Sequence, residues 1–261
     1  MTNERHPAVA GLFYPDNPRT LRTAVTDYLR VVPEAGSVPK AIIAPHAGYI
    51  YSGPVAATAY ARLKPARGKI QRVVLLGPSH RVGFRGLALS SADFFVTPLG
   101  RISLDQEAAA KITDLPQVRV MDVAHAQEHS LEVHLPFLQE VLGEFRLLPL
   151  VVGEASPEEV SEVLELLWGG PETLIVISSD LSHYHGYALA QKMDRSTSDA
   201  IEALRYEDIQ RDDACGRIPV NGLLHLARKR HLNVHTIDLR NSGDTAGTRD
   251  SVVGYGAYVV E

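Results

Sequence analysis

Three apolar runs of the sequence each end in side chains that can bind metals or transfer protons. The side chains that follow these runs within a few residues are His46, His80, Asp180 and His183. Imidazole and carboxylate groups are common metal ligands and common general acids or bases. A single histidine after a strand is more often a loop residue bonded to a backbone carbonyl, but three such ends among the predicted strands favour a shared site.

The elements that would bring these side chains together are predicted from hydrophobic patterns. Residues 40–45 and 71–77 are largely apolar without alternation, which is typical of buried parallel strands. Residues 53–63 between them predict a helix with Pro54 in its first turn, so the three segments form a βαβ unit whose strands share a direction. If the strand predicted at 173–178 is parallel to them, all three carboxyl ends lie at one sheet edge, where open α/β sheets bind ligands.

The remaining segments favour the same class of fold. Further helices are predicted at 105–112, 157–169, 189–205 and 219–231, and further strands at 145–153 and 251–260. Strands that alternate with helices predict an α/β fold, a three-layer α/β/α sandwich around a mostly parallel sheet with mixed edges. Residues 84–104 have no helical period and predict a β-hairpin excursion or an antiparallel edge. We expect one domain over residues 1–261.

One histidine-rich segment adds candidate pocket residues. His129 and His134 are five positions apart, so they point to different sides of a helix or a strand, but Pro136 makes an irregular backbone plausible. We expect the pocket to include His129, Glu132 and His134. We expect His125 to lie at the start of a helix as a polar residue in contact with water.

The one cysteine, Cys215, precedes a predicted helix and leaves three roles open. It could be a small buried hydrophobe, a reactive thiol or a metal ligand. Single cysteines are most often small buried residues, which favours the first role. A thiolate near a helix N-terminus, however, has a lowered pKa, which would suit the second.

A polar, glycine-rich loop spans residues 241–251. It matches neither the Walker A pattern nor GxGxxG. The alternatives are a phosphate-binding loop and a mobile lid.

The composition is that of an ordinary globular protein. Of 261 residues, 45% are hydrophobic and 22% are charged. The net charge of −5 argues against nucleic-acid binding, which usually requires a basic face.

No apolar segment predicts a signal peptide or a membrane span. A single cysteine excludes an intrachain disulfide, and this fits a reducing compartment, so we expect a cytoplasmic location.

With these pieces in place, the sequence resembles the Memo family, called AmmeMemoRadiSam system protein B in bacteria and archaea, which is related in fold to the class III extradiol dioxygenases. The matching stretches occur in family order: AGLFYP (10–15), IIAPHAGYIYSG (42–53), LLGPSH (75–80), EHSLEVHLPF (128–137), SSDLSH (178–183), CGRIPV (215–220) and SGDTAGTRDSVVGYGAY (242–258). They cover nearly the whole chain. Leu12 departs from the pattern, where we expect a serine.

The resemblance implies a site for iron or copper made of His46, His80 and Cys215. In the related extradiol enzymes the third ligand is a glutamate and the metal is iron(II). A thiolate is softer than a carboxylate, favours copper(I) or zinc, and can itself be oxidised. Asp180 is the alternative third ligand and would restore an iron-type set. The histidine that serves as acid and base in the related enzymes is similar in position to His183, three residues after Asp180.

Three functions follow from these predictions. The first is a metal-dependent redox protein, or an extradiol-type dioxygenase, with catalytic candidates His183, Asp180, His134 and His129. The second is a non-catalytic module that grips a peptide or protein through a pocket containing Tyr49, Tyr51 and Glu132. The third is a metal-free nucleophile, Cys215, with a histidine base. The family name also implies a radical SAM protein as a partner.

Overall fold

The computed structural model describes residues 3–33 and 36–261 and shows a large mixed sheet between helices. Within these ranges the main sheet is nine-stranded. Its strands, in order across the sheet, are β10 (His183–His185), β12 (Val252–Val260), β2 (Ala41–Ala44), β9 (Thr173–Ser178), β3 (Arg72–Pro78), β8 (Arg146–Val152), β4 (Leu87–Leu89) and β7 (Val118–Val120), and β11 (Val234–Asn241) pairs with β12.

The central strands of this sheet are parallel. β9 lies between β2 and β3 and runs parallel to both, and β3 runs parallel to β8. β12 is antiparallel to β2, and β4 is antiparallel to β8, so the edges are mixed. The prediction of a mostly parallel sheet with mixed edges is therefore confirmed. The central strands are buried along almost their entire length, which explains why their sequences do not alternate.

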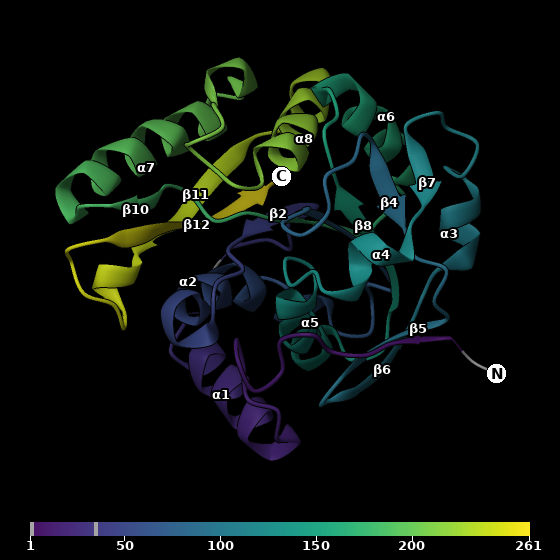
Figure 1. Cartoon of the computed structure of the whole chain (residues 1–261), viewed down its shortest axis with the longest axis horizontal. Coiled ribbons are helices and arrows are strands. Elements are labelled where there is room, and N and C mark those ends of the chain that lie inside the picture. The colour runs from purple at the N-terminus through teal and green to yellow at the C-terminus, as the bar shows by residue number, and fades with distance from the viewer. Residues whose placement is uncertain (1–2, 34–35) are drawn as a thin grey trace.

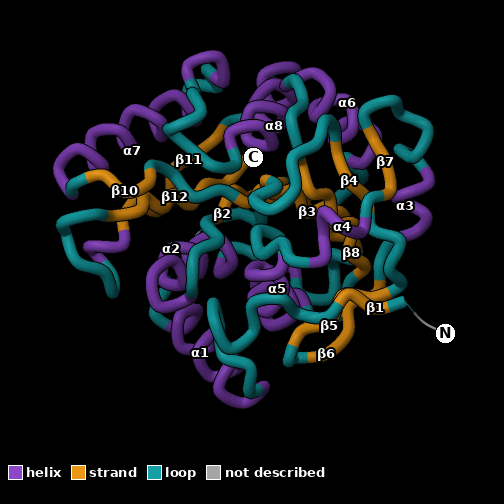
Figure 2. Tube along the Cα trace, viewed as in Figure 1, coloured by secondary structure: helices purple, strands orange, loops and turns teal. Residues whose placement is uncertain are grey.

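Helices cover both faces of the sheet and complete three layers (Figures 1 and 2). One face is covered by α1 (Pro18–Arg30), α2 (Tyr49–Ala61) and α5 (Leu135–Leu142). The other is covered by α6 (Pro157–Leu167), α7 (Tyr187–Glu202) and α8 (Arg217–Lys229). Each helical layer forms its own apolar core with one face of the sheet. The predicted α/β/α sandwich is thus confirmed.

The segment 84–104 contributes to two sheets. β4 belongs to the main sheet, whereas β5 (Phe94–Thr97) and β6 (Gly100–Ser103) form an antiparallel hairpin that joins β1 (Glu4–Arg5) in a separate small sheet. Both predicted alternatives, a hairpin excursion and an antiparallel strand, therefore occur in one segment. Two short helices, α3 (Gln106–Ala110) and α4 (Asp122–Ala126), follow it.

Helix α2 begins earlier than predicted. Gly48 is its N-cap, and the backbone N–H groups of Tyr51 and Ser52 both donate to the Gly48 carbonyl. The prediction that Pro54 lies in the first turn is therefore wrong, because Pro54 lies inside the helix. A proline there leaves the carbonyl of Ile50 without its helical partner. Ile50 is 61% exposed, so water can take the place of that partner.

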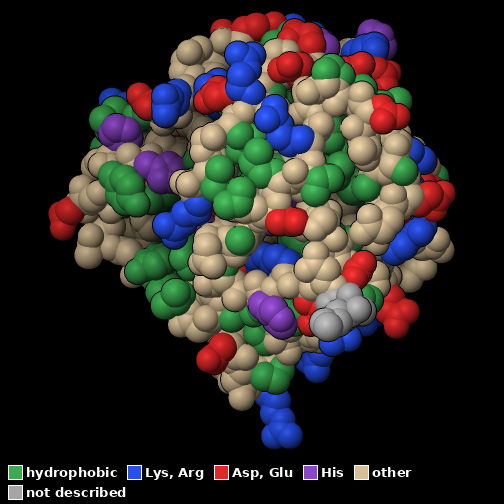
Figure 3. Space-filling view, turned by 45° about the vertical axis from the view of Figure 1, so that its right-hand side comes forward, with side chains coloured by type: hydrophobic (Ala, Val, Ile, Leu, Met, Phe, Trp, Pro, Cys, Tyr) green, Lys and Arg blue, Asp and Glu red, His purple; other side chains and the backbone are tan. Residues whose placement is uncertain are grey.

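Two surface properties complete the description. None of the helices in the described ranges is long and apolar enough to cross a bilayer. Figure 3 shows acidic and basic side chains interspersed over one face of the molecule, without a field of a single sign.

Helices α6 and α8 approach each other closely at Gly222, and this contact gives a stability prediction. A Cβ atom added at Gly222 would lie 2.3 Å from Cγ1 of Val160. We expect Gly222→Ala to lower the free energy of unfolding by about 1–3 kcal/mol through overpacking. Urea denaturation measures this change.

A double variant tests the proposed cause. Val160→Ala removes the nearest clashing atom, Cγ1, but keeps the Val160 Cβ at 2.4 Å, so it relieves part of the overpacking, and the Gly222→Ala/Val160→Ala protein should lose less stability than the sum of the two single losses. Gly83→Ala is the matched control, because its added methyl would meet no atom within 4 Å. Strict additivity, or a stable Gly222→Ala protein, would contradict the account.

Candidate metal centre

Three side chains from separate parts of the chain bring metal-ligand atoms together at the carboxyl edge of the sheet. His46 follows β2, His80 follows β3, and Cys215 directly precedes the N-cap of α8. One ligand atom of each lies within 4.8 Å of those of the other two. Nε2 of His46 lies 3.4 Å from the Cys215 sulfur, and the two imidazole rings are 5.2 Å apart.

The ring of His46 is held in one tautomer by Ser178, the last residue of β9. Nδ1 of His46 lies 2.6 Å from the Ser178 hydroxyl, which donates its own hydrogen to the Ser130 carbonyl at 2.7 Å. A hydroxyl has one hydrogen, so here it can only accept from His46. Nδ1 therefore carries the proton, and the lone pair of Nε2 is directed to the Cys215 side.

The ring of His80 is oriented in the same way by a carboxylate. Glu128 is buried and accepts from Nδ1 of His80 at 2.9 Å and from the His80 backbone N–H at 2.6 Å. Burial alone would raise the pKa of Glu128, but the hydrogen bonds from His80 and from the Ser130 backbone hold it at about 2. An ionised Glu128 requires the proton on Nδ1 of His80, so Nε2 is the ring nitrogen that is placed to bind a metal.

Cys215 is positioned by the backbone of Asp180. The Asp180 N–H donates to the sulfur at 3.3 Å, and the Cys215 N–H donates to the Asp180 carbonyl at 3.2 Å. Gly216 permits this approach, because a Cβ atom there would lie 2.3 Å from the Ser178 carbonyl oxygen. Burial, together with the Asp180 charge, raises the pKa of the thiol well above its ordinary value. A bound cation has the opposite effect on a thiol, so metal binding would be coupled to loss of its proton.

These residues fit a metal ion. Two imidazoles present Nε2 atoms, each ring is oriented by a partner on Nδ1, and the third donor is a sulfur. Burial and the neighbouring histidines lower the pKa of His46, so its ring is neutral at neutral pH. This is the ligand set and the outer support that protein metal sites use.

A second group of possible ligands lies beside the first. His80, Glu128 and His129 also have ligand atoms within 4.8 Å of one another. The Glu128 carboxylate, however, already accepts from His80 and from the backbone N–H groups of His129 and Ser130. A metal there would have to displace these hydrogen bonds. The set of His46, His80 and Cys215 is therefore the better candidate for binding a metal ion.

Asp180 and His183 lie next to the donor atoms. One Asp180 oxygen accepts from the His46 backbone N–H at 2.8 Å, and the other lies 4.0 Å from Nε2 of His46. Burial raises the pKa of the Asp180 carboxyl to about 6. His183 is half-buried, and its neighbour Tyr184 has a positive φ of 60°, a strained value for a tyrosine, and is 77% exposed.

A cavity of about 800 Å³, here called the histidine cavity, opens over this group. Its lining residues are Phe13, His46, Ala47, Gly48, Tyr51, His80, Arg81, His129, Asp180, His183, Tyr184, Ser242, Ala246, Gly247, Thr248, Ser251, Val253 and Tyr255. The glycine-rich loop thus contributes to its wall.

The two further histidines of the predicted pocket occupy different positions. His129 lines the histidine cavity with its ring 4.6 Å from that of His80, and burial together with His80 lowers its pKa to about 4. His134 is buried beneath the cavity, with Nδ1 2.7 Å from the Tyr60 hydroxyl and its pKa lowered to about 3 by burial. It does not line the cavity, and Nε2 has no hydrogen-bond partner among the described residues.

Tyr49 and Glu132 do not line the cavity, although the sequence placed them there. Tyr49 is buried and donates to the Val133 carbonyl at 2.8 Å. Glu132 has no exposed surface and forms an ion pair with Arg5. Both side chains are used by internal contacts that the local sequence does not reveal.

Glu132 also fastens the N-terminal segment to the core. Its carboxylate accepts from the backbone N–H groups of Ala8 and Val9 at 2.7 and 3.0 Å, and from the Tyr14 hydroxyl at 2.6 Å.

The prediction for His125 is also wrong, because this residue is 2% exposed and its Nε2 lies 2.9 Å from the Ala88 carbonyl. It therefore does not solvate a helix start.

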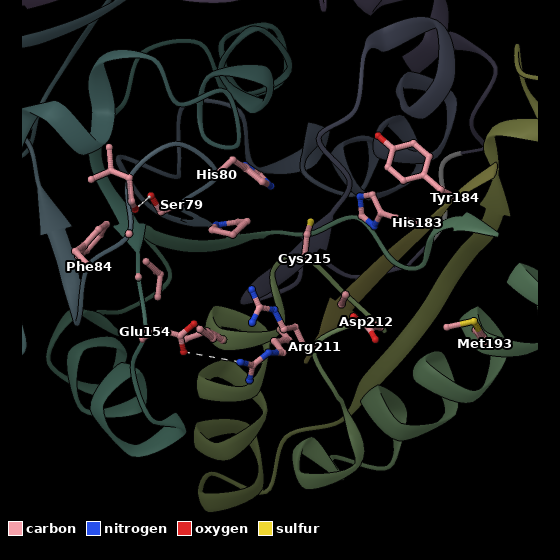
Figure 4. Close-up of a pocket in the computed structure, with 18 of the residues that line it drawn as sticks. Ser79, His80, Phe84, Glu154, His183, Tyr184, Met193, Arg211, Asp212 and Cys215 are labelled. Carbon is pink, nitrogen blue, oxygen red and sulfur yellow. Dashed lines mark hydrogen bonds and ion pairs between the residues drawn. The ribbon is translucent and has the colours of Figure 1, made fainter. Parts of the chain in front are cut away.

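The sequence did not single out the residues that orient the ligands. Ser178 and Glu128 lie in two of the quoted stretches, but a serine at a strand end and a glutamate near a helix have many ordinary uses. A polar residue that closes a fully apolar run was the one available signal for Ser178. Figure 4 shows Cys215 and His80 on a second cavity that the sequence also did not predict.

Comparison with known proteins identifies full-length relatives. The family model described as Memo-like protein matches residues 5–259. The chain is 37% identical to a MEMO1 family protein of Aquifex aeolicus, covering 96% of this chain and 97% of that one. It is 36% identical to a MEMO1 family protein of Methanosarcina barkeri, covering 98% and 100%. The crystal structure of the uncharacterized protein JW3007 from Escherichia coli K12 is similar in fold, with a TM-score of 0.50 at 13% identity over 84% of this chain and 98% of that one.

The role assigned to Glu132 gives a stability prediction. Glu132→Ala leaves the buried Arg5 guanidinium without its partner, so we expect the free energy of unfolding to fall by about 3–5 kcal/mol. Tyr14→Phe removes one hydrogen bond and should cost about 1–2 kcal/mol.

Glu140→Ala is the control, because it removes a more exposed pair with Arg22 and should change stability by less than about 1 kcal/mol. Urea denaturation of the three variants gives the comparison. Equal losses in Glu132→Ala and Glu140→Ala would show that the buried carboxylate does not hold the segment.

Proposed function

Because this chain belongs to the Memo family, we propose that it holds a redox-active metal, iron or copper, through His46, His80 and Cys215. The observation that carries the proposal is the meeting of three ligand atoms whose imidazoles are already oriented by Ser178 and Glu128. Buried polar groups cost free energy unless they are paired. Here the buried Ser178 and Glu128 orient two imidazoles whose ligand atoms lie close to a sulfur. A bound metal at that point is the best explanation of this arrangement.

The donor set favours a soft metal over the iron(II) of an oxygenase. Two histidines and a carboxylate suit iron(II) with open positions, whereas a thiolate adds affinity for copper(I). Asp180 accepts a hydrogen bond from the His46 backbone and lies at the wall of the site, and it is not one of the three mutually close donors. We therefore favour Cys215 over Asp180 as the third ligand, and a soft-metal redox centre over a catechol-cleaving dioxygenase.

The residues around the donors would control access and protons. When bound, the metal would supply one-electron chemistry and an open position for a small molecule. Asp180 and His183 face the histidine cavity and are the groups we propose to hold or move a proton next to that position. His129 closes the same wall as a neutral imidazole.

Metal analysis of variants tests the ligand set. Protein purified anaerobically after growth with iron and copper should carry metal, and His46→Ala, His80→Ala and Cys215→Ala should each lower the metal content at least roughly 10-fold. Elemental analysis by mass spectrometry gives the metal and its stoichiometry.

His129→Ala is the matched control, because His129 lies 4.6 Å from His80 but belongs only to the second group of ligands. The proposal requires that His129→Ala keep its metal. Loss of metal in His129→Ala and retention in Cys215→Ala would move the site to His80, Glu128 and His129. Equal, negligible metal in the wild type and the His46→Ala/His80→Ala double variant would end the proposal.

The orienting role of Ser178 gives a separate prediction. Without its hydroxyl, the His46 ring loses the acceptor that fixes its tautomer. We expect Ser178→Ala to weaken metal affinity about 10-fold to 100-fold, measured by competition with a chelator of known affinity.

Ser52→Ala is the control for a lost buried hydroxyl, because Ser52 donates to the Ala47 carbonyl and does not touch a ligand. Its metal affinity should equal that of the wild type. If both variants lose stability equally and neither loses metal affinity, Ser178 has only a structural role.

A second candidate function is the capture of a peptide in the same cavity. The exposed Tyr184 and the partly exposed Tyr51 line it and could contact an extended chain. Partnership with a radical SAM protein stays a prediction from the family name. Peptide binding that survives Tyr51→Ala/Tyr184→Ala would exclude this use of the cavity.

A further inference from the structure

A second cavity, here called the arginine cavity, lies on the Cys215 side of the donor atoms (Figure 4). It has a volume of about 730 Å³, and its wall includes Arg211, Arg217, Cys215 and His80. His46 and Asp180 line only the histidine cavity, Cys215 lines only the arginine cavity, and His80 lines both. The donor atoms therefore form part of the partition between two cavities.

Arg211 brings an uncompensated charge to this space. Among residues 3–33 and 36–261, no carboxylate oxygen lies within the 4.0 Å pairing distance of its guanidinium. Figure 4 shows its side chain reaching into the cavity, on the side where Cys215 and His80 also lie. A free guanidinium next to a cavity offers a fork of N–H donors that matches carboxylate and phosphate oxygens.

Arg217 reinforces this charge. Its side chain is 30% exposed, and its one acidic neighbour in the described ranges, Glu154, lies 3.8 Å away with a side chain that is 69% exposed. An exposed pair at that distance contributes little free energy, so Arg217 can exchange Glu154 for a stronger anionic partner at low cost. Asp212 also lines the cavity; it is exposed, as Arg211 is, and it is not paired with either arginine.

The start of helix α8 faces the same space. Arg217 is its first residue, Gly216 is its N-cap, and no side chain caps the helix. The N-terminus of a helix of this length carries a partial positive charge. Its N–H groups add little here, because those of Gly216 and Arg217 already donate to Ser179 and Ala214 and Pro219 has none. The helix thus adds to the positive potential of the two arginines, and Ala214, Cys215 and Ile218 from the same turn line the cavity.

We infer that the arginine cavity is a binding site for a small molecule that carries a carboxylate or phosphate group, with Arg211 and Arg217 as the residues that hold the anion. This goes beyond the proposed function, because the two arginines line the cavity and can bind an anion whether or not a metal is bound. The volume accommodates a molecule larger than the anion itself. The rest of such a molecule would lie against Cys215 and His80, within reach of the donor atoms.

Binding of simple anions tests the inference on the full-length protein. Inorganic phosphate and malonate serve as probes for the two chemistries, with calorimetry and the shift of the unfolding temperature as readouts. We expect one or both anions to bind, and Arg211→Gln and Arg217→Gln each to weaken that binding by about 10-fold to 100-fold. Chloride at equal ionic strength corrects for general screening.

Arg81→Gln is the matched control, because Arg81 lines the histidine cavity and not the arginine cavity. Its anion affinity should equal that of the wild type. The inference is overturned if neither probe binds at millimolar concentration, if Arg211→Gln and Arg217→Gln bind as the wild type does, or if Arg81→Gln alone loses binding. Metal content measured on the same variants should be unchanged, so failure of the anion site is distinguishable from failure of the metal site.

Discussion

β9 hydrogen-bonds with β2 on one side and β3 on the other, and all three strands run in the same direction. This pairing fixes where each chain segment leaves the sheet, since the carboxyl ends of parallel strands meet at one edge. Ser178, the last residue of β9, can then reach His46 across one strand spacing and Ser130 on the next layer. The register of β9 therefore decides both the distance between the two ligand histidines and the tautomer of one of them.

Burial at this edge has an electrostatic consequence. Four histidines with rings 4.6–6.5 Å from His46 or from each other would repel strongly if they were protonated. Desolvation lowers the pKa values of His46, His129 and His134, so these three rings stay neutral and pack as near neighbours. The same burial keeps the Cys215 thiol protonated until a cation compensates it. These three neutral rings can therefore lie close together at the sheet edge without repelling one another.

The sequence predicted those parts of the site that depend on strand ends and missed those that depend on contacts between layers. His46, His80, Asp180 and His183 were expected to lie together because parallel strands impose a common edge, and all four line the histidine cavity. Glu132 was misplaced because its partner, Arg5, is distant in the sequence and draws the carboxylate away from the cavity. The start of α2 was misplaced because a proline is usual in a first turn, whereas here an exposed turn tolerates it deeper in the helix.

The two cavities support the proposal that the third ligand is a cysteine rather than a carboxylate. Cys215 is the only one of the three donors that faces the arginine cavity alone. A carboxylate there would face the same cavity as Arg211 and Arg217, and pairing with either arginine would weaken it as a ligand. Sulfur is a weaker hydrogen-bond acceptor than a carboxylate oxygen. Under the two proposals made above, a sulfur ligand would compete less for the arginines, so a metal and an anion could be bound on the two sides of Cys215.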